Sequence, residues 1–170
     1  MAGYRDDPRQ KLITQGRKMK TFAAACLYLA CRIMKSPHLL IDFADAIKED
    51  KSAQASYELM YKIAGVYEII RSKILLKEHS IPLVDPSLFI EKFCLKLDFD
   101  DKFHAVKNTS IRLIQSMNRS WIAEGRRPNG LCGAAILIAA KIHGFKRTPN
   151  QICKAVHAGE ETIRKRLDEF

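Results

Sequence analysis

Pairs of basic residues flank the most apolar stretches of this 170-residue sequence, and they are its clearest candidates for chemistry. Three such pairs occur: Arg17 and Lys18, Arg126 and Arg127, and Lys146 and Arg147. Guanidinium and ammonium groups beside the backbone amides of a helix start can hold a phosphate or a carboxylate. A solvated loop is the alternative for any single pair. Because the first two pairs recur at equivalent points of a repeat, described below, we interpret them as candidate anion-binding loops.

The stretch 160–170 carries a second group of basic side chains. Arg164, Lys165 and Arg166 could contact a DNA backbone, where each neutralised phosphate makes binding more sensitive to salt. Glu160 and Glu161 stand four residues before Arg164 and Lys165, in the orientation that favours helix ion pairs. Glutamates at a helix start suit the helix dipole but repel phosphate. We therefore expect contact with the DNA backbone, and no strong reading of base edges by the first turn of this helix.

Residues that could support catalysis or bind a metal are scattered. The five histidines form no HExxH motif, the five cysteines form no CxxC pair, and no glycine loop has the ending that cradles phosphates. Cys132 is conceivable as a nucleophile, but an apolar helix raises the pKa of a thiol and leaves it inert. We therefore expect neither an enzyme nor a bound cofactor.

The composition favours an acidic partner for a folded, intracellular chain. The net charge is +10, and residues 1–80 and 81–170 each contribute +5, so the charge belongs to both halves. Such a balance favours nucleic acid, an anionic membrane or an acidic protein surface. The odd number of cysteines is typical of reduced core residues. No stretch has the roughly 20 apolar residues of a membrane span and the start lacks a signal peptide, so we expect a soluble intracellular protein.

The elements that must position the basic pairs are two apolar helices. The stretches 22–31 and 131–140 are uncharged and apolar around the whole helix, which is typical of a helix surrounded by other helices. GRKMKTFAAACLYLACRI (16–33) and GRRPNGLCGAAILIAAKI (125–142) superpose at an offset of 109 residues. This degenerate repeat predicts two copies of one helical unit.

Helical periodicity continues around these central helices, and no segment alternates like a strand. Further helices are expected at about 52–73, 86–97 and 101–123, the last with Phe103, Val106, Leu113, Met117 and Trp121 on its buried face. The two prolines within 81–86 break the pattern. We therefore predict an all-α protein with a first unit at 1–80 and a second unit at 81–170.

The stretch 148–170 predicts a helix-turn-helix-like pair at the end of the second unit. Thr148 can cap a helix, and Gln151 completes a capping box with it. Gly159 is expected to supply the turn, and Ile163 with Leu167 the buried side of the next helix. The apolar spacing is not a perfect match to the form that reads DNA bases.

Two helical units, each with an Ala-rich central helix entered through a GR loop, resemble the tandem cyclin-like five-helix repeats of the TFIIB family. WIAEGRRPNGLCGAAILIAAKIHGFKRT (121–148), DPSLFIEKF (85–93), HLLIDFADAI (38–47) and EETIRKRLDEF (160–170) are similar to the TFIIB-related branch of the RNA polymerase III initiation factor TFIIIB. The resemblance covers residues 9–170. It implies two tandem cyclin-like repeats.

The resemblance also implies a nuclear role in transcription initiation, with TATA-binding protein, promoter DNA and RNA polymerase III as partners. In that family the basic loop of the first repeat lies near an acidic loop of TATA-binding protein, which here implies Arg17 and Lys18. The last helix of the second repeat lies along DNA, which implies Arg164. The full set that we expect at DNA is Arg164, Lys165, Arg166, Arg126, Arg127, Lys146 and Arg147.

Three departures from the family pattern carry expectations of their own. Fifteen residues precede the first GR signature, and about 40 residues of the second unit precede the second one, so the first repeat is expected to lack its opening helix and part of its second. The exposed face of its central helix should then be adhesive. The zinc ribbon and the long carboxy-terminal region of the family have no counterpart in this sequence, so no zinc is expected here.

Two alternatives remain open at the level of sequence. A true cyclin, which activates a kinase by protein contact alone, would have the same fold, because fold does not settle function. A scaffold that binds neither DNA nor a kinase is the other.

Overall fold

The computed structural model describes residues 16, 18–50, 52–74, 84–120 and 125–169. The chain divides into two compact units, Met1–Leu83 and Val84–Phe170, and the division falls within the proline-containing stretch 81–86. The described residues are helical and include no strand. No helix among them is both long enough and apolar enough to cross a lipid bilayer.

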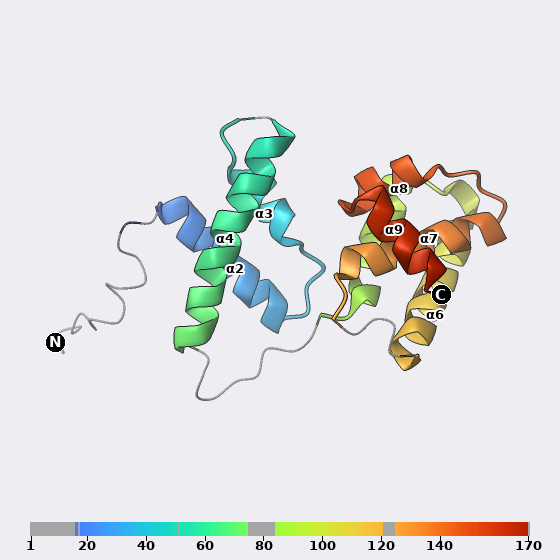
Figure 1. Ribbon diagram of the computed structural model, residues 1–170, viewed down its shortest axis with the longest axis horizontal. Coiled ribbons are helices and arrows are strands. Elements are labelled where there is room, and N and C mark those ends of the chain that lie inside the picture. Colours follow the sequence, from blue (N-terminus) through green and yellow to red (C-terminus); the bar gives the residue numbers. More distant parts are fainter. Residues whose placement is uncertain (1–15, 17, 51, 75–83, 121–124, 170) are drawn as a thin grey trace. The chain divides into compact units, whose positions relative to one another are not determined.

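The first unit contains helices α2 (Met19–Ile33), α3 (Leu40–Ile47) and α4 (Ala53–Ile74) in its described part. The long helix α4 packs against both of the others (Figure 1). Their buried core consists mainly of small and branched side chains: Ala24, Ala25, Ala44, Ile63, Val66 and Ile70. Three aromatic rings of this unit pack together, since the Tyr28 ring lies 5.9 Å from that of Phe43 and 5.0 Å from that of Tyr67.

The second unit surrounds α7 with other helices. Its elements are η1 (Pro86–Phe89), α5 (Ile90–Leu97), η2 (Asp100–Lys102), α6 (Phe103–Arg119), α7 (Pro128–Ile142), α8 (Pro149–Val156) and α9 (Glu160–Asp168). Helices α5, α6, α8 and α9 all contact α7, and α9 lies over it in Figure 1. Ten residues of α7 are buried, as expected for a helix that is apolar on all sides.

The two central helices are equivalent residue by residue, which confirms the predicted duplication. Both have 15 residues at the offset of 109. Each follows a glycine in the left-handed region, with φ of 75° at Gly16 and 67° at Gly125. The N-cap residues also match, since Lys18 has φ −63° and ψ 129° and Arg127 has φ −69° and ψ 131°. The chain therefore consists of two tandem cyclin-like repeats.

The predicted helix-turn-helix-like pair forms, but a different residue supplies its turn. The capping box of Thr148 and Gln151 is present at the start of α8. The left-handed turn residue is His157, with φ 54°, rather than the expected Gly159. Gly159 is instead the extended N-cap of α9, a position at which glycine is well tolerated.

Helix α6 buries a different face from the predicted one. Val106 and Met117 are buried as expected, but the buried face passes through Ser110 and Ile114 and leaves Leu113 only partly covered. Ser110 can be buried because its hydroxyl donates a hydrogen bond of 2.8 Å to the Val106 carbonyl. A serine at that position disguised the stripe in the sequence. Trp121 lies outside the described residues.

Candidate nucleic-acid and protein interfaces

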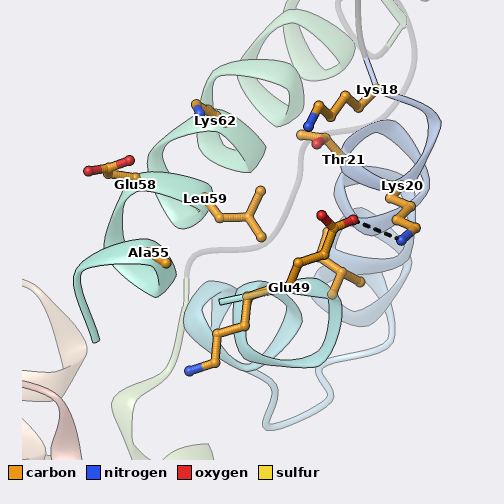
Figure 2. A pocket seen from close by; sticks show the side chains of 10 residues that line it. Lys18, Lys20, Thr21, Glu49, Ala55, Glu58, Leu59 and Lys62 are labelled. Atoms are coloured by element: carbon orange, nitrogen blue, oxygen red, sulfur yellow. Dashed lines mark hydrogen bonds and ion pairs between the residues drawn. The ribbon is translucent and has the colours of Figure 1, made fainter. Parts of the chain in front are cut away.

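A hollow of about 230 Å³ opens in the first unit between the start of α2, the end of α3 and the first half of α4. Its lining is rich in lysine and includes Lys18, Lys20, Lys48 and Lys62. Figure 2 shows Leu59 pointing from α4 toward α2, and the lining also includes Glu49 and Glu58. The hollow therefore combines an apolar floor with a rim in which four lysines outnumber two glutamates, an excess of positive charge that suits an acidic side chain or loop.

Only part of this basic rim is neutralised within the unit. The ammonium group of Lys20 lies 3.3 Å from the Glu49 carboxylate. That of Lys48 lies 2.9 Å from Asp45, and it donates a hydrogen bond of 2.8 Å to Ser56. These two lysines are held by their neighbours.

Lys18 and Lys62 form the part of the rim that is open to a ligand. In the part of the chain that the structure describes, no acidic group pairs with either ammonium. Both line the hollow, and both are exposed. An incoming carboxylate would therefore find two unpaired cations here.

The two units differ at two positions of the central helix. Thr21 and Ala24 occupy the positions that Gly130 and Gly133 occupy in α7. In the second unit, a Cβ on Gly130 would lie 2.9 Å from Thr162 of α9, so only glycine permits that close contact. Thr21 and Ala24 are both buried, so they bring side chains into the corresponding part of the first unit.

The sequence predicted one of the two open lysines. Lys18 lies on the rim, whereas its neighbour Arg17 lies outside the described residues. Lys62 was missed because it stands on the polar side of a long helix, with no local motif to mark it. Its place on the rim depends on α4 packing beside α2, a tertiary contact.

In the second unit, the corresponding end is formed by the start of α7 and by α9. The side-chain amide of Asn129 donates a hydrogen bond of 2.7 Å to the last carbonyl of α8, at Val156, which connects the start of α7 to the end of α8. Arg127, the N-cap of α7, is exposed and has no side-chain hydrogen bond or ion pair with another described residue, while Arg126 pairs with Glu169 at 3.1 Å. Arg127 is therefore available to an anion, and Arg126 is partly engaged.

Arg164 and Lys165 occupy exposed positions on α9. Arg164 pairs with Glu160 at 3.1 Å and Lys165 with Glu161 at 2.8 Å, as their spacing predicted. The hydrogen bond from Lys165 lowers the pKa of Glu161. Such exposed pairs are weak and easily exchanged for phosphate contacts, so both cations remain candidates for DNA.

We expected Arg166 to contact DNA, but its side chain is buried within the unit. Its exposed fraction is 9%, and its aliphatic stem faces Gly130 of α7. One guanidinium nitrogen lies close to the Glu169 carboxylate, and Nε has no hydrogen-bond partner in the described structure. The 3.6-residue period turns Arg166 to the same side as the buried Ile163, so it belongs to the α7–α9 contact.

Lys146 and Arg147 lie beyond the other end of α7, which is about 22 Å long for its 15 residues. Arg147 is bound within the unit, because its guanidinium donates to the Asp98 carbonyl and lies 5.5 Å from the centre of the Phe99 ring. Lys146 is exposed. The seven cations predicted for DNA therefore do not form one patch, and those at the α7–α9 end are Arg127, Arg164 and Lys165, with Arg126 partly engaged.

A comparison with known protein families identifies the family to which this chain belongs. The sequence model of the transcription factor TFIIB repeat matches residues 7–63 and 79–170, which is most of the chain and covers both units. The chain belongs to the TFIIB repeat family. Each matched segment contains one of the two equivalent central helices.

Curated relatives of this TFIIB repeat protein are transcription initiation factors. It is 40% identical over 158 residues to the transcription factor IIIB 90 kDa subunit of Homo sapiens, covering 93% of this chain and 22% of that one. It is 39% identical over 156 residues to the 70 kDa subunit of Saccharomyces cerevisiae, covering 92% and 24%. Transcription initiation factor IIB of Pyrococcus furiosus is 30% identical over 167 residues, covering 98% and 51%. The chain thus spans about a quarter of the IIIB relatives.

The cysteines of this TFIIB repeat protein are all free. Burial raises the pKa of the Cys132 thiol, as its apolar helix predicted, and raises that of Cys94 to about 12. Cys26 departs from the expectation of a core residue because it is exposed on α2. Among the described residues, no cluster of three or more His, Cys, Asp or Glu side chains could hold a metal ion.

Replacing Glu169 by alanine is expected to destabilise the second unit by about 2 kcal/mol, because it leaves the buried guanidinium of Arg166 without its carboxylate. It also removes the partner of Arg126. The measurement is peptide-resolved hydrogen exchange, in which α7 and α9 should exchange faster. Glu161→Ala is the matched control, since it removes an exposed carboxylate from the same helix. Equal effects of the two substitutions would contradict the structural role of Glu169.

Proposed function

We propose that this chain is the repeat region of a nuclear, non-enzymatic transcription initiation factor of the TFIIIB type. It binds TATA-binding protein and flanking promoter DNA together and thereby helps to assemble an RNA polymerase III initiation complex. One observation carries the proposal. Both repeats present cations at the same end of their central helix, with Lys18 and Lys62 in the first, and Arg127, Arg164 and Lys165 in the second. The similarity to transcription factor IIIB subunits supports it.

The cation-bearing ends of the two repeats have different shapes, which supports a different partner for each. The end of the first repeat is a hollow with an apolar floor. It favours a protein loop that brings carboxylates to the open lysines and an apolar side chain to the floor. We assign it to TATA-binding protein. The end of the second repeat presents exposed cations from two separate helix positions, Arg127 before α7 and Arg164 with Lys165 on α9, which favours a phosphate backbone. We assign it to DNA beside the TATA element.

Salt dependence tests the DNA half of the proposal. Arg127→Ala and Arg164→Ala should each weaken binding to a complex of TATA-binding protein and TATA-box DNA by about 1 kcal/mol. Each should reduce the slope of log affinity against log salt by about 0.9, the effect of losing one phosphate contact. The measurement is a titration by fluorescence anisotropy of labelled DNA at several salt concentrations.

Arg71→Ala provides the control for net charge. Arg71 is exposed on the last part of α4, where it pairs with Glu68, and it lines no part of the hollow. Its removal changes the charge equally and should leave the slope unchanged. If all three variants behave alike, the assigned DNA contacts are wrong. Capture of a kinase at high salt, with no dependence on DNA, would instead support a true cyclin.

A further inference from the structure

Glu169 lies between two arginines of the second unit. Its Oε1 atom lies 3.1 Å from Nη2 of Arg126, and its Oε2 atom contacts Nη1 of Arg166. The side chain of Arg126 is 47% exposed, whereas that of Arg166 is only 10% exposed. One carboxylate therefore joins a solvated guanidinium before α7 to a buried guanidinium on α9.

The same place in the first unit is the hollow. When α4 and α9 are matched at the first buried residue of each helix, Lys62 of the rim corresponds to Glu169, and Leu59 of the floor corresponds to Arg166. The first unit thus has an open cation where the second unit has a carboxylate. The second unit supplies to itself the kind of group that the hollow would take from a partner.

Burial makes the contact with Arg166 the firmer of the two. Removing the partner of a buried charge leaves that charge uncompensated away from water. Nε of Arg166 has no hydrogen-bond partner in the described structure, so this guanidinium depends on Glu169. Water and salt weaken the exposed contact with Arg126 instead. Glu169 can therefore stay on Arg166 while Arg126 changes partners.

This arrangement keeps Arg126 from acting as a free cation. A phosphate that approaches Arg126 must replace the Glu169 carboxylate as its partner, and the nearby carboxylate also repels the phosphate. Arg127, the next residue, is exposed and pairs with no acidic group among the described residues. Two adjacent arginines of the same loop thus differ in how readily they bind an anion.

We propose that Glu169 is an internal competitor for the phosphate groups of duplex DNA at Arg126, and that it thereby limits how tightly the second unit binds DNA. When DNA binds, Arg126 exchanges the carboxylate for a phosphate, and Glu169 remains paired with Arg166. The contact between α7 and α9 is therefore kept during the exchange. This inference deepens the proposed function and rests on it, because it concerns the same DNA-facing end of the second unit.

A double-mutant cycle on the full chain tests this competition. Affinity for a labelled duplex of arbitrary sequence is measured by fluorescence anisotropy at several salt concentrations, without TATA-binding protein. Glu169→Gln keeps a side-chain oxygen for Arg166 but removes the negative charge. It should raise the affinity about fivefold and increase the slope of log affinity against log salt by about 0.9. Arg126→Ala should change the affinity by less than about twofold in the wild type, but it should abolish the whole gain in the Glu169→Gln protein.

Asp168→Asn is the matched control for net charge. Asp168 is exposed on the same helix and forms no ion pair with another described residue. Its replacement raises the net charge by the same amount, but it should not make the affinity sensitive to Arg126→Ala. Circular dichroism at the assay temperature checks that each variant is folded. If Glu169→Gln is unfolded, the wild-type background decides: Arg126→Ala should leave the salt slope unchanged, whereas Arg127→Ala should lower it by about 0.9.

Several results would overturn the proposal. Glu169→Gln could give no gain, or a gain that persists without Arg126. Equal losses of slope from Arg126→Ala and Arg127→Ala in the wild type would show that Arg126 is already free. A gain from Asp168→Asn that also depends on Arg126 would show a general effect of charge. These outcomes leave the proposed function standing, because Arg127 and Arg164 would still contact DNA. The proposed function fails separately, if Arg127→Ala and Arg164→Ala have no effect on binding to the complex of TATA-binding protein and DNA.

Discussion

Replacing Gly133 by valine is expected to destabilise the second unit by about 2–3 kcal/mol, although valine suits the apolar surroundings. A Cβ at this position would lie 2.8 Å from Cδ1 and 3.0 Å from Cγ1 of Ile163, and 3.2 Å from Val156. Ile163 is only 1% exposed, so its side chain has no free space to move into. The added atoms would therefore push α9 away from α7.

A second mid-helix glycine provides the control for Gly133. Gly65 lies in α4, where an added Cβ would meet nothing within 4 Å. Gly65→Ala should stabilise the first unit by about 1 kcal/mol, the ordinary gain in helix propensity. Hydrogen exchange resolved by peptide reports each unit separately. If Gly133→Val leaves exchange in α7 and α9 unchanged, the close contact between them does not exist in solution.

Reversing the charge of both open lysines, with Lys18→Glu and Lys62→Glu together, is expected to weaken binding to TATA-binding protein about 100-fold. Both ammonium groups line the hollow without an acidic partner among the described residues. The substitution replaces two attractive contacts with two repulsive ones, and like charges across an interface cost several kcal/mol. An effect of 100-fold corresponds to about 2.7 kcal/mol.

The measurement is a direct titration with TATA-binding protein in the absence of DNA. Arg112→Glu with Lys141→Glu is the matched control, because it changes the net charge by the same amount on exposed residues of the second unit. This control should weaken binding only slightly at physiological salt, since distant exposed charges are screened. A similar loss for both double variants would show a general charge effect and would remove the hollow as the binding site.

The exposed face of α2 follows from a difference between the two repeats. At equivalent positions, Leu27 is 58% exposed and Ile136 is fully buried, although both stand in uncharged apolar helices. The apolar pattern predicts that a helix will be covered, but it does not determine which segment covers it.

What the sequence by itself determined is local or repetitive. The offset of 109 predicted two equivalent central helices, and the capping box predicted the start of α8, because both depend on residues near one another in the chain. The i, i+4 pairs of α9 were predicted for the same reason. Only the tertiary structure decided which cations are open. Arg166 is buried because α9 turns it toward Gly130, and Lys62 reaches the hollow because α4 packs beside α2. Burial and charge pairing depend on contacts between distant segments, which no local pattern encodes.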